Sequence, residues 1–344
     1  MKIKYNYIFF IVATVLAFIV GSRGATPDTQ IYLNIFKNID KYPLYSLSAF
    51  YEESSIELGF GWILYTISFI TNSPTILFTI ISFSIFTILY LITKKLNLNP
   101  LLILIVYISS SYFIYLQFMQ IRQGISSLLA LYIALNLINL SRKNCSILNI
   151  LILLALSILC ISIHQSSILL LILAIFYIAS LNKNFSLRLF KLILVSIILF
   201  FSTLSSFLLE LITPLSQRLM DYKISEYNYN LPIISMINIK SLMIFFIILF
   251  FMNKELYKSS SFKFLVFIFT VSFSFRLGFY DFAILGGRLA STLSIVEIFI
   301  LPQIILSLRP PFKILLVPYI VMQAYISYII QVPYLVQTYF TPFQ

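Results

Sequence analysis

Long apolar runs recur along almost the whole chain, and each is close to the roughly 20 residues that a membrane-spanning helix requires. The runs lie at residues 7–21, 75–93, 101–118, 123–140, 146–163, 166–181, 189–211, 235–252, 263–280, 289–307 and 314–331. The polar segments between them are too short to form a separate soluble domain. The pattern therefore predicts an all-α polytopic membrane protein, with residues 1–344 forming a single integral membrane domain of about eleven transmembrane helices.

The basic residues fall mainly in alternate polar segments, which predicts the orientation of the chain. If the segments that contain Lys2, Lys94 and Arg142 face the cytoplasm, that side carries 14 basic residues and one acidic residue. The other side then carries 9 of each sign. Cytoplasmic segments of membrane proteins are enriched in lysine and arginine. We therefore expect a cytoplasmic amino terminus, with 22–56 and 212–234 as two external loops.

A shorter apolar run at 57–71 complicates this orientation. Two full spans at 57–71 and 75–93 would place Lys94 and Lys95 on the external side. We therefore predict that 57–71 is a re-entrant or interfacial segment. The alternative is a complete span at 57–71, with the two lysine side chains snorkelling towards the external surface.

The composition agrees with a chain that is solvated by lipid. Hydrophobic residues make up 60% of the sequence and charged residues 10%, whereas soluble domains carry about 25% charged residues. An ordinary soluble enzyme is therefore excluded. The net charge of +12 follows the membrane topology, so we expect no nucleic-acid partner. A single histidine and two cysteines predict no metal centre and no cofactor.

Several cations and one imidazole are expected at the same external leaflet boundary. They are Arg122, followed by Gln123 at the start of 123–140; His164, followed by Gln165 in the turn after 146–163; and Arg276 and Arg288, which border 263–280 and 289–307. Arginine matches phosphate oxygens with a planar set of donors and keeps its charge. Histidine can act as a general base near neutral pH. The set predicts a site for a lipid-linked diphosphate, although arginines near helix ends also commonly snorkel and a lone histidine is often structural.

Other polar residues have positions relative to this set that suggest their roles. Ser126 and Ser167 stand one helical turn from Arg122 and His164, and we expect them to support those side chains. In the loop 22–56, Asp28 and Tyr32 share a face of a short amphipathic helix with Phe36, which suits either a sugar site or plain packing against the membrane. Glu297 stands about 180° around its helix from Arg288, so we expect it to pair elsewhere in the bundle.

The order of these motifs resembles the EpsG/Wzy-type oligosaccharide repeat-unit polymerases. The resemblance rests on Asp28-x-x-x-Tyr32 with Glu57-Leu58-Gly59-Phe60 after it, on Ile121-Arg122-Gln123-Gly124, on Ile163-His164-Gln165-Ser166-Ser167, and on Gly287-Arg288. It covers about residues 20 to 300. In this chain Leu58 stands where the family usually has proline after the glutamate.

The resemblance implies a glycosyltransferase with a GT-C-like arrangement. Such an enzyme lies in the bacterial inner membrane and polymerises O-antigen or capsular units at the periplasmic face, and undecaprenyl-diphosphate-linked oligosaccharides are both donor and acceptor. A chain-length regulator protein is a further candidate partner, besides the membrane lipid. We expect Arg122, Arg288 and Arg276 to bind the diphosphate and His164 to serve as the base, with Asp28 or Glu57 in reserve. The alternative function is a lipid-linked oligosaccharide flippase or another transporter, which should carry its ionisable groups deep in the bundle.

Overall fold

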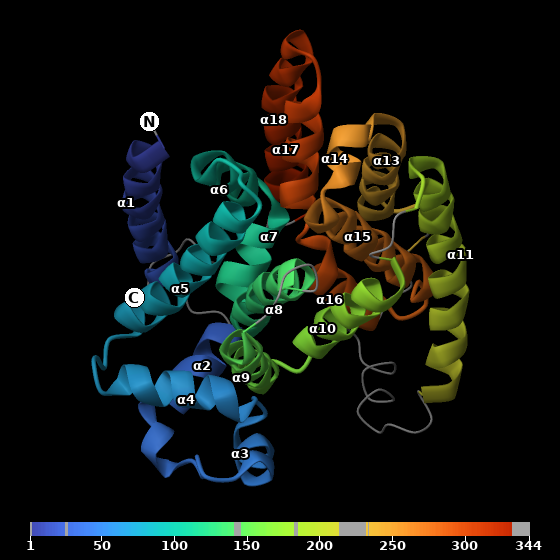
Figure 1. The fold of residues 1–344 in the computed structure, drawn as a ribbon. Coiled ribbons are helices and arrows are strands. Elements are labelled where there is room, and N and C mark those ends of the chain that lie inside the picture. Colours follow the sequence, from blue (N-terminus) through green and yellow to red (C-terminus); the bar gives the residue numbers. More distant parts are fainter. Residues whose placement is uncertain are drawn as a thin grey trace. The chain divides into compact units, whose positions relative to one another are not determined.

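The computed structural model describes residues 2–24, 27–140, 146–181, 185–212, 232 and 234–331. These residues form helices joined by short connections, and no strand occurs among them (Figure 1). The chain divides into two compact units. Unit 1 comprises 1–172 and 314–344, and unit 2 comprises 173–313. Most of the predicted external loop 212–234 lies outside the described residues.

Unit 1 contains the long helices at both ends of the chain and a set of short helices between them. Its helices are α1 (Lys2–Gly21), α2 (Pro27–Lys37), η1 (Ile39–Lys41), α3 (Leu47–Ser54), α4 (Leu58–Ser68), α5 (Pro74–Lys95), α6 (Pro100–Ser109), α7 (Ser111–Ile114), η2 (Tyr115–Met119), α8 (Ile121–Leu140), α9 (Ile147–Ile163), the start of α10 (Ser167–Phe176), α18 (Leu316–Tyr325) and η6 (Ile326–Gln331).

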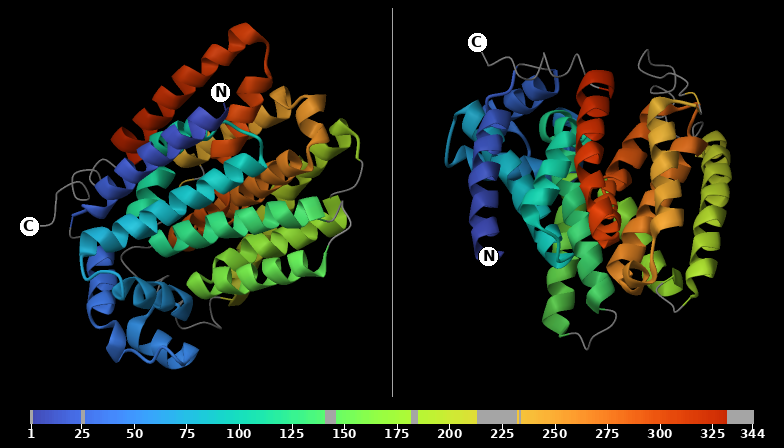
Figure 2. Two further views of the ribbon diagram at one scale, coloured as in Figure 1. Left: turned by 60° about the vertical axis from the view of Figure 1, so that its left-hand side comes forward. Right: turned by 90° about the horizontal axis from the view of Figure 1, so that it is seen from above.

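The centre of unit 1 is α8. It packs against α5 on one side and α9 on the other, and α1 lies against the far side of α5 (Figure 2). Two thirds of the apolar stretch of α8 is buried, compared with 11% of the stretch at Pro310–Gln331 that contains α18. Most side chains of the Pro310–Gln331 stretch are therefore not buried. Because they are apolar, lipid rather than water must solvate them.

The short helices α2, α3 and α4 lie together at one end of unit 1 (Figures 1 and 2). The predicted amphipathic segment corresponds to α2, in which Tyr32 and Phe36 are buried. The run at 57–71 forms α4, whose 11 residues span about 16 Å. That length is roughly half the hydrocarbon thickness of a bilayer, and the re-entrant or interfacial placement of this run stays a prediction.

The predicted span at 101–118 is not one straight helix, because the chain bends by 84° between α6 and the segment Ser111–Met119. The break falls in a run of three serines. The hydroxyls of Ser109 and Ser110 donate to the carbonyls of Val106 and Tyr107, at 2.9 and 2.6 Å. Serine side chains compete in this way with backbone hydrogen bonds. An apolar average over the run does not reveal such a break.

Arg23 is fully buried near the end of η2, and it belongs to the segment 22–56 that the sequence predicts to be an external loop. Its guanidinium donates to the carbonyls of Gln117 and Phe118, at the end of η2. It also lies 4.2 Å from the ring centroid of Phe78. The last carbonyls of a helix lack partners within the helix, and Arg23 supplies donors to two of them.

Unit 2 is built around α15. Its helices are the end of α10, η3 (Tyr177–Leu181), α11 (Leu187–Ile212), α13 (Met236–Phe251), α14 (Lys254–Lys258), α15 (Ser260–Gly278), α16 (Ala283–Ser294), α17 (Glu297–Ser307) and η5 (Pro310–Leu315), which ends in unit 1. Helix α15 contacts α11, α13, α16 and α17, and 78% of its apolar stretch is buried. By contrast, only 17% of the stretch in α11 is buried.

The predicted span at 289–307 is also bent, since Leu285–Ser294 and Glu297–Ser307 meet at an angle of 43°. Glu297 is the first residue of α17 and is buried, and its carboxylate accepts a hydrogen bond from Lys240 of α13. The expectation that Glu297 pairs within the bundle is confirmed. An acidic side chain in the first turn also suits the positive end of the helix dipole.

The apolar runs of the sequence all fall on helices. Among the described residues, five helices are long and apolar enough to cross a membrane, or up to seven if each bent pair counts as one span. Five shorter apolar helices of 10–17 residues account for the other runs, α4 among them. The all-α class and the membrane character are confirmed, whereas the count of about eleven spans and the single domain stay predictions.

Candidate functional site

The carboxylate of Glu57 stands between Arg122 and His164, which are far apart along the chain. Its Oε2 accepts a hydrogen bond from Nη1 of Arg122, and its Oε1 lies 2.8 Å from Nδ1 of His164. The backbone N–H of Gln165 also donates to Oε1, at 3.4 Å. The side chains of Glu57, Arg122 and His164 are 11, 20 and 25% exposed. We call these three residues the Glu57 cluster.

Local structure fixes each member of the cluster. Glu57 immediately precedes α4, after Ser55 turns the chain with a left-handed φ of 57°. Arg122 lies in the first turn of α8. His164 follows the last residue of α9 in an extended conformation. The cluster therefore forms where the ends of three helices of unit 1 meet.

Tyr32 extends the cluster on the side of Arg122. Its hydroxyl accepts a hydrogen bond from Nε of Arg122 at 3.3 Å, and the guanidinium carbon lies 5.8 Å from the Tyr32 ring centroid. The Tyr32 ring also contacts Phe60 of α4, at 5.4 Å between ring centroids. Burial raises the pKa of Tyr32, against the opposing effect of the Arg122 charge, so its hydroxyl stays protonated. Arg122 is therefore positioned by α2 and α4 together.

Electrostatics keep Glu57 ionised. Burial alone would raise the pKa of the carboxyl, but the hydrogen bond with His164 and the charge of Arg122 outweigh it and lower the pKa to about 2. A carboxylate with a pKa this low is a poor proton acceptor at neutral pH. Glu57 is suited instead to hold the histidine ring in one tautomer, with the proton on Nδ1 and Nε2 able to accept one.

A pH series should show the contribution of this carboxylate to stability. Because the folded pKa lies below the ordinary value of 4.5, the stabilisation is present above about pH 4.5 and is lost as the pH falls towards 2. We expect the difference in melting temperature between the wild type and Glu57→Gln to be larger at pH 6 than at pH 3, measured in detergent micelles. An equal difference at both values would contradict an ionised Glu57.

Gly59 allows the cluster to assemble. A Cβ at this position would lie 2.6 Å from the backbone carbonyl carbon of Ser162, so α4 and α9 touch through their backbones two residues from Glu57 and two from His164. Gly124 makes a similar close approach, since its Cβ would lie 2.5 Å from the carbonyl oxygen of Leu116. Backbone atoms cannot move aside as a flexible side chain can.

We therefore expect Gly59→Ala to separate Glu57 from His164. In the complementation experiment described below, the variant should lose most of the activity of the wild type. The protein should still accumulate in membranes, because the new methyl group acts mainly on the spacing of two helices. Gly287→Ala is the matched control, since a Cβ there has no neighbour within 4 Å. Equal activity of the two variants would show that the contact of α4 with α9 does not position the cluster.

The supporting hydroxyls act on the backbone. Ser167 donates to the carbonyl of His164 at 2.8 Å, and Ser126, fully buried, donates to the carbonyl of Gln123 at 3.3 Å. The carbonyl of Ser126 in turn accepts from the thiol of Cys160 at 3.0 Å, which joins α8 to α9. These serines shape the turns around Arg122 and His164 instead of bonding to their side chains.

The remaining predicted residues lie in two places. Asp28 is one turn before Tyr32 on α2, half-buried, and its charge acts on the Tyr32 hydroxyl. Arg276, in the last turn of α15, and Arg288, exposed on α16, belong to unit 2. The structure thus joins Glu57, Arg122, His164 and Tyr32, and it leaves the convergence of the three arginines a prediction.

Sequence reasoning missed the central place of Glu57, which it treated only as a reserve base. The signals available were its place at the start of the short glycine-containing apolar run 57–71 and in the Glu57-Leu58-Gly59-Phe60 motif. Among the described residues, no group of three or more histidine, cysteine, aspartate or glutamate side chains is placed to hold a metal ion.

One comparison with known proteins gave a match. The model described as the EpsG family matches residues 6–344, which is nearly the entire chain. No curated protein and no solved structure matches the sequence.

Proposed function

The chain belongs to the EpsG family, and from that premise we propose that it polymerises oligosaccharide repeat units carried on undecaprenyl diphosphate. The product is an O-antigen or capsular polysaccharide, formed at the periplasmic face of the bacterial inner membrane within a GT-C-like architecture. The observation that carries the proposal is the Glu57 cluster, in which one carboxylate holds both a histidine and an arginine.

The reaction exchanges one bond at the anomeric carbon of the donor. The bond from this carbon to the diphosphate oxygen breaks, and undecaprenyl diphosphate leaves with the electron pair. A hydroxyl oxygen of the second lipid-linked unit forms the new glycosidic bond. Its proton passes to Nε2 of His164, which Glu57 makes available by bonding to Nδ1.

Arginines stabilise the charge on the leaving diphosphate. A guanidinium has five N–H donors, and Arg122 uses its Nε and Nη1 groups towards Tyr32 and Glu57. Because Glu57 offsets much of the charge of Arg122, we expect a diphosphate to need further cations, for which the sequence predicts Arg288 and Arg276. Removing one such donor commonly costs about 3–4 kcal/mol of transition-state stabilisation.

A complementation experiment tests this function. In a strain that lacks its own copy of the gene, the wild type should restore the polysaccharide ladder on a gel. Arg122→Ala should leave single repeat units at equal protein level. Arg188→Ala is the matched control, because Arg188 is exposed at the start of α11.

The position of the accumulated intermediates distinguishes polymerase from flippase. Loss of a polymerase leaves lipid-linked repeat units on the periplasmic face, where an impermeant sugar-modifying reagent labels them. Repeat units that are trapped on the cytoplasmic face would contradict the proposal and favour the flippase.

A further inference from the structure

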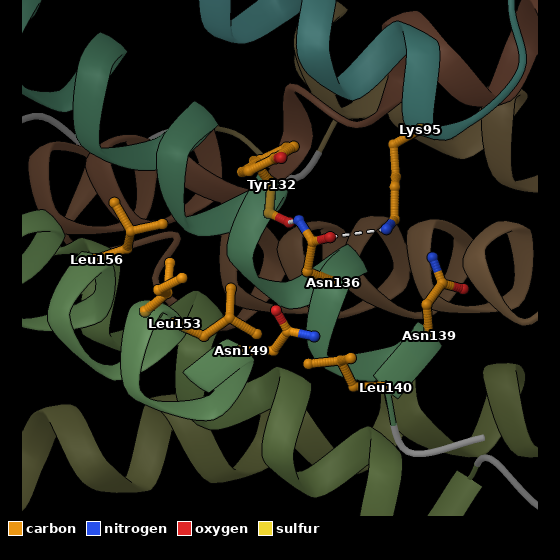
Figure 3. A pocket seen from close by; sticks show the side chains of 9 residues that line it. Lys95, Tyr132, Asn136, Asn139, Leu140, Asn149, Leu153 and Leu156 are labelled. Atoms are coloured by element: carbon orange, nitrogen blue, oxygen red, sulfur yellow. Dashed lines mark hydrogen bonds between the residues drawn. The ribbon is translucent and has the colours of Figure 1, made fainter. Parts of the chain in front are cut away.

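A cavity of about 380 Å³ lies in unit 1 between the ends of three helices (Figure 3). Its lining residues come from three helices. Lys95 lies in the last turn of α5. The second half of α8 contributes Tyr132, Asn136, Asn139 and Leu140, and the first three turns of α9 contribute Asn149, Ile152, Leu153 and Leu156. The Glu57 cluster contributes none of them.

One side of the cavity is polar and positively charged. The ammonium of Lys95 donates to Oδ1 of Asn136 at 2.7 Å, while Nδ2 of Asn136 donates to the carbonyl of Tyr132 at 2.8 Å. Figure 3 shows Asn139 and Asn149 on either side of this pair. The lining residues include one cation and no carboxylate. A cation with several amide groups suits an anion that also carries hydroxyl groups.

The other side of the cavity is apolar. Leu153 and Leu156 form this wall (Figure 3), and Ile152 also lines the cavity. The wall continues onto the outer face of α9, where Leu151, Leu154 and Ile158 are exposed and require lipid as their solvent. The cavity therefore fits a molecule with an anionic head and an apolar tail. Its volume is near the lower end of the roughly 300–1,000 Å³ of ligand sites, which suits a headgroup better than an oligosaccharide.

The cavity and the Glu57 cluster lie at opposite ends of the same helices. Asn136 is 14 residues after Arg122 on α8, or about 21 Å along the axis. Asn149 precedes His164 by 15 residues on α9, or about 22 Å. Since the positive-inside pattern predicts that Lys94 and Lys95 are cytoplasmic, the cavity belongs to the leaflet opposite the proposed active face.

We propose that this cavity binds the phosphate headgroup of an anionic glycerophospholipid of the cytoplasmic leaflet. Lys95 and Asn136 bind the phosphodiester, Asn139 and Asn149 bind the headgroup hydroxyls, and an acyl chain lies along Leu153 and Leu156. This inference does not depend on the polymerase activity.

Binding of short-chain lipids to the purified full-length protein tests the proposal. Dihexanoyl phosphatidylglycerol should bind more tightly than dihexanoyl phosphatidylcholine, because the choline cation would face Lys95. Lys95→Met should weaken phosphatidylglycerol binding by about tenfold or more, as a lost charge-assisted hydrogen bond does. Lys94→Met is the matched control, since Lys94 occupies the same helical turn, carries the same charge and lies outside the cavity lining.

A second variant tests the same site if Lys95→Met does not fold. Asn149→Leu changes an exposed side chain of the polar wall, whose backbone N–H bonds to Ser146 and is unaffected. It should also weaken phosphatidylglycerol binding. Equal effects of Lys94→Met and Lys95→Met would overturn the site. Binding of inorganic phosphate as tight as that of the lipid would overturn the lipid as its occupant.

Discussion

Glu57→Gln is expected to reduce polymerisation by about a hundredfold or more, the usual range for general acid–base catalysis. Glutamine fills the same space but carries no charge, so it neither fixes the tautomer of His164 nor offsets the charge of Arg122. The measurement is the polysaccharide ladder formed by a deletion strain that expresses the variant, normalised to the amount of protein in the membrane.

Glu53→Gln is the matched control, because Glu53 is an exposed carboxylate on the neighbouring helix α3. Since Glu57 acts through His164, the pH profile of the remaining activity should also change in Glu57→Gln and stay unchanged in Glu53→Gln. A complete ladder from Glu57→Gln, with the pH profile of the wild type, would refute a positioning role for this carboxylate.

The second large effect concerns the ion pair between Glu297 and Lys240 in unit 2. The two side chains are only 3 and 14% exposed. Glu297→Ala leaves a buried ammonium without its carboxylate, and breaking a buried pair on one side typically costs about 3–5 kcal/mol. We expect a clear fall in the melting temperature of the purified protein, measured by size-exclusion chromatography after heating in detergent.

The double variant Lys240→Met with Glu297→Leu should recover most of that loss, because apolar side chains of similar volume often replace a buried pair without penalty. Glu255→Ala provides the control, since its pair with Lys258 is 72–79% exposed and is worth no more than about 1 kcal/mol. A double variant as unstable as Glu297→Ala would contradict this expectation, because it would show that apolar side chains cannot replace the pair.

Apolar periodicity located the helices well because lipid imposes one strict requirement, a continuous apolar segment of sufficient length. The same average could not reveal the breaks at Ser110 and between Ser294 and Glu297. At the first break, serine side chains compete for backbone hydrogen bonds. After the second, Glu297 bonds to Lys240, which is distant in the sequence. The burial of Arg23 could not be predicted either, since nothing in its neighbouring sequence indicates its contacts with the carbonyls of Gln117 and Phe118.

The candidate site was predictable in its components but not in its connections. Arg122 and His164 stand at helix ends that the charge pattern assigns to one face, so their proximity could be expected. That Glu57 joins them depends on the backbone contact of Gly59 with Ser162, and glycine in an apolar run has no single meaning in a sequence. Likewise, the hydroxyls near these residues fit a helical spacing, yet they bond to carbonyls.

Because one carboxylate bonds to both Arg122 and His164, the net charge of the Glu57 cluster changes during the proposed transfer. With His164 neutral, the formal charges of Glu57 and Arg122 cancel, and the three side chains carry no net charge. Once the imidazole captures a proton from the attacking hydroxyl, the same group becomes a monocation. In the proposed reaction this positive charge arises at the moment when the departing diphosphate gains its negative charge, so attraction for the anion grows with the progress of the transfer and is weaker before it begins.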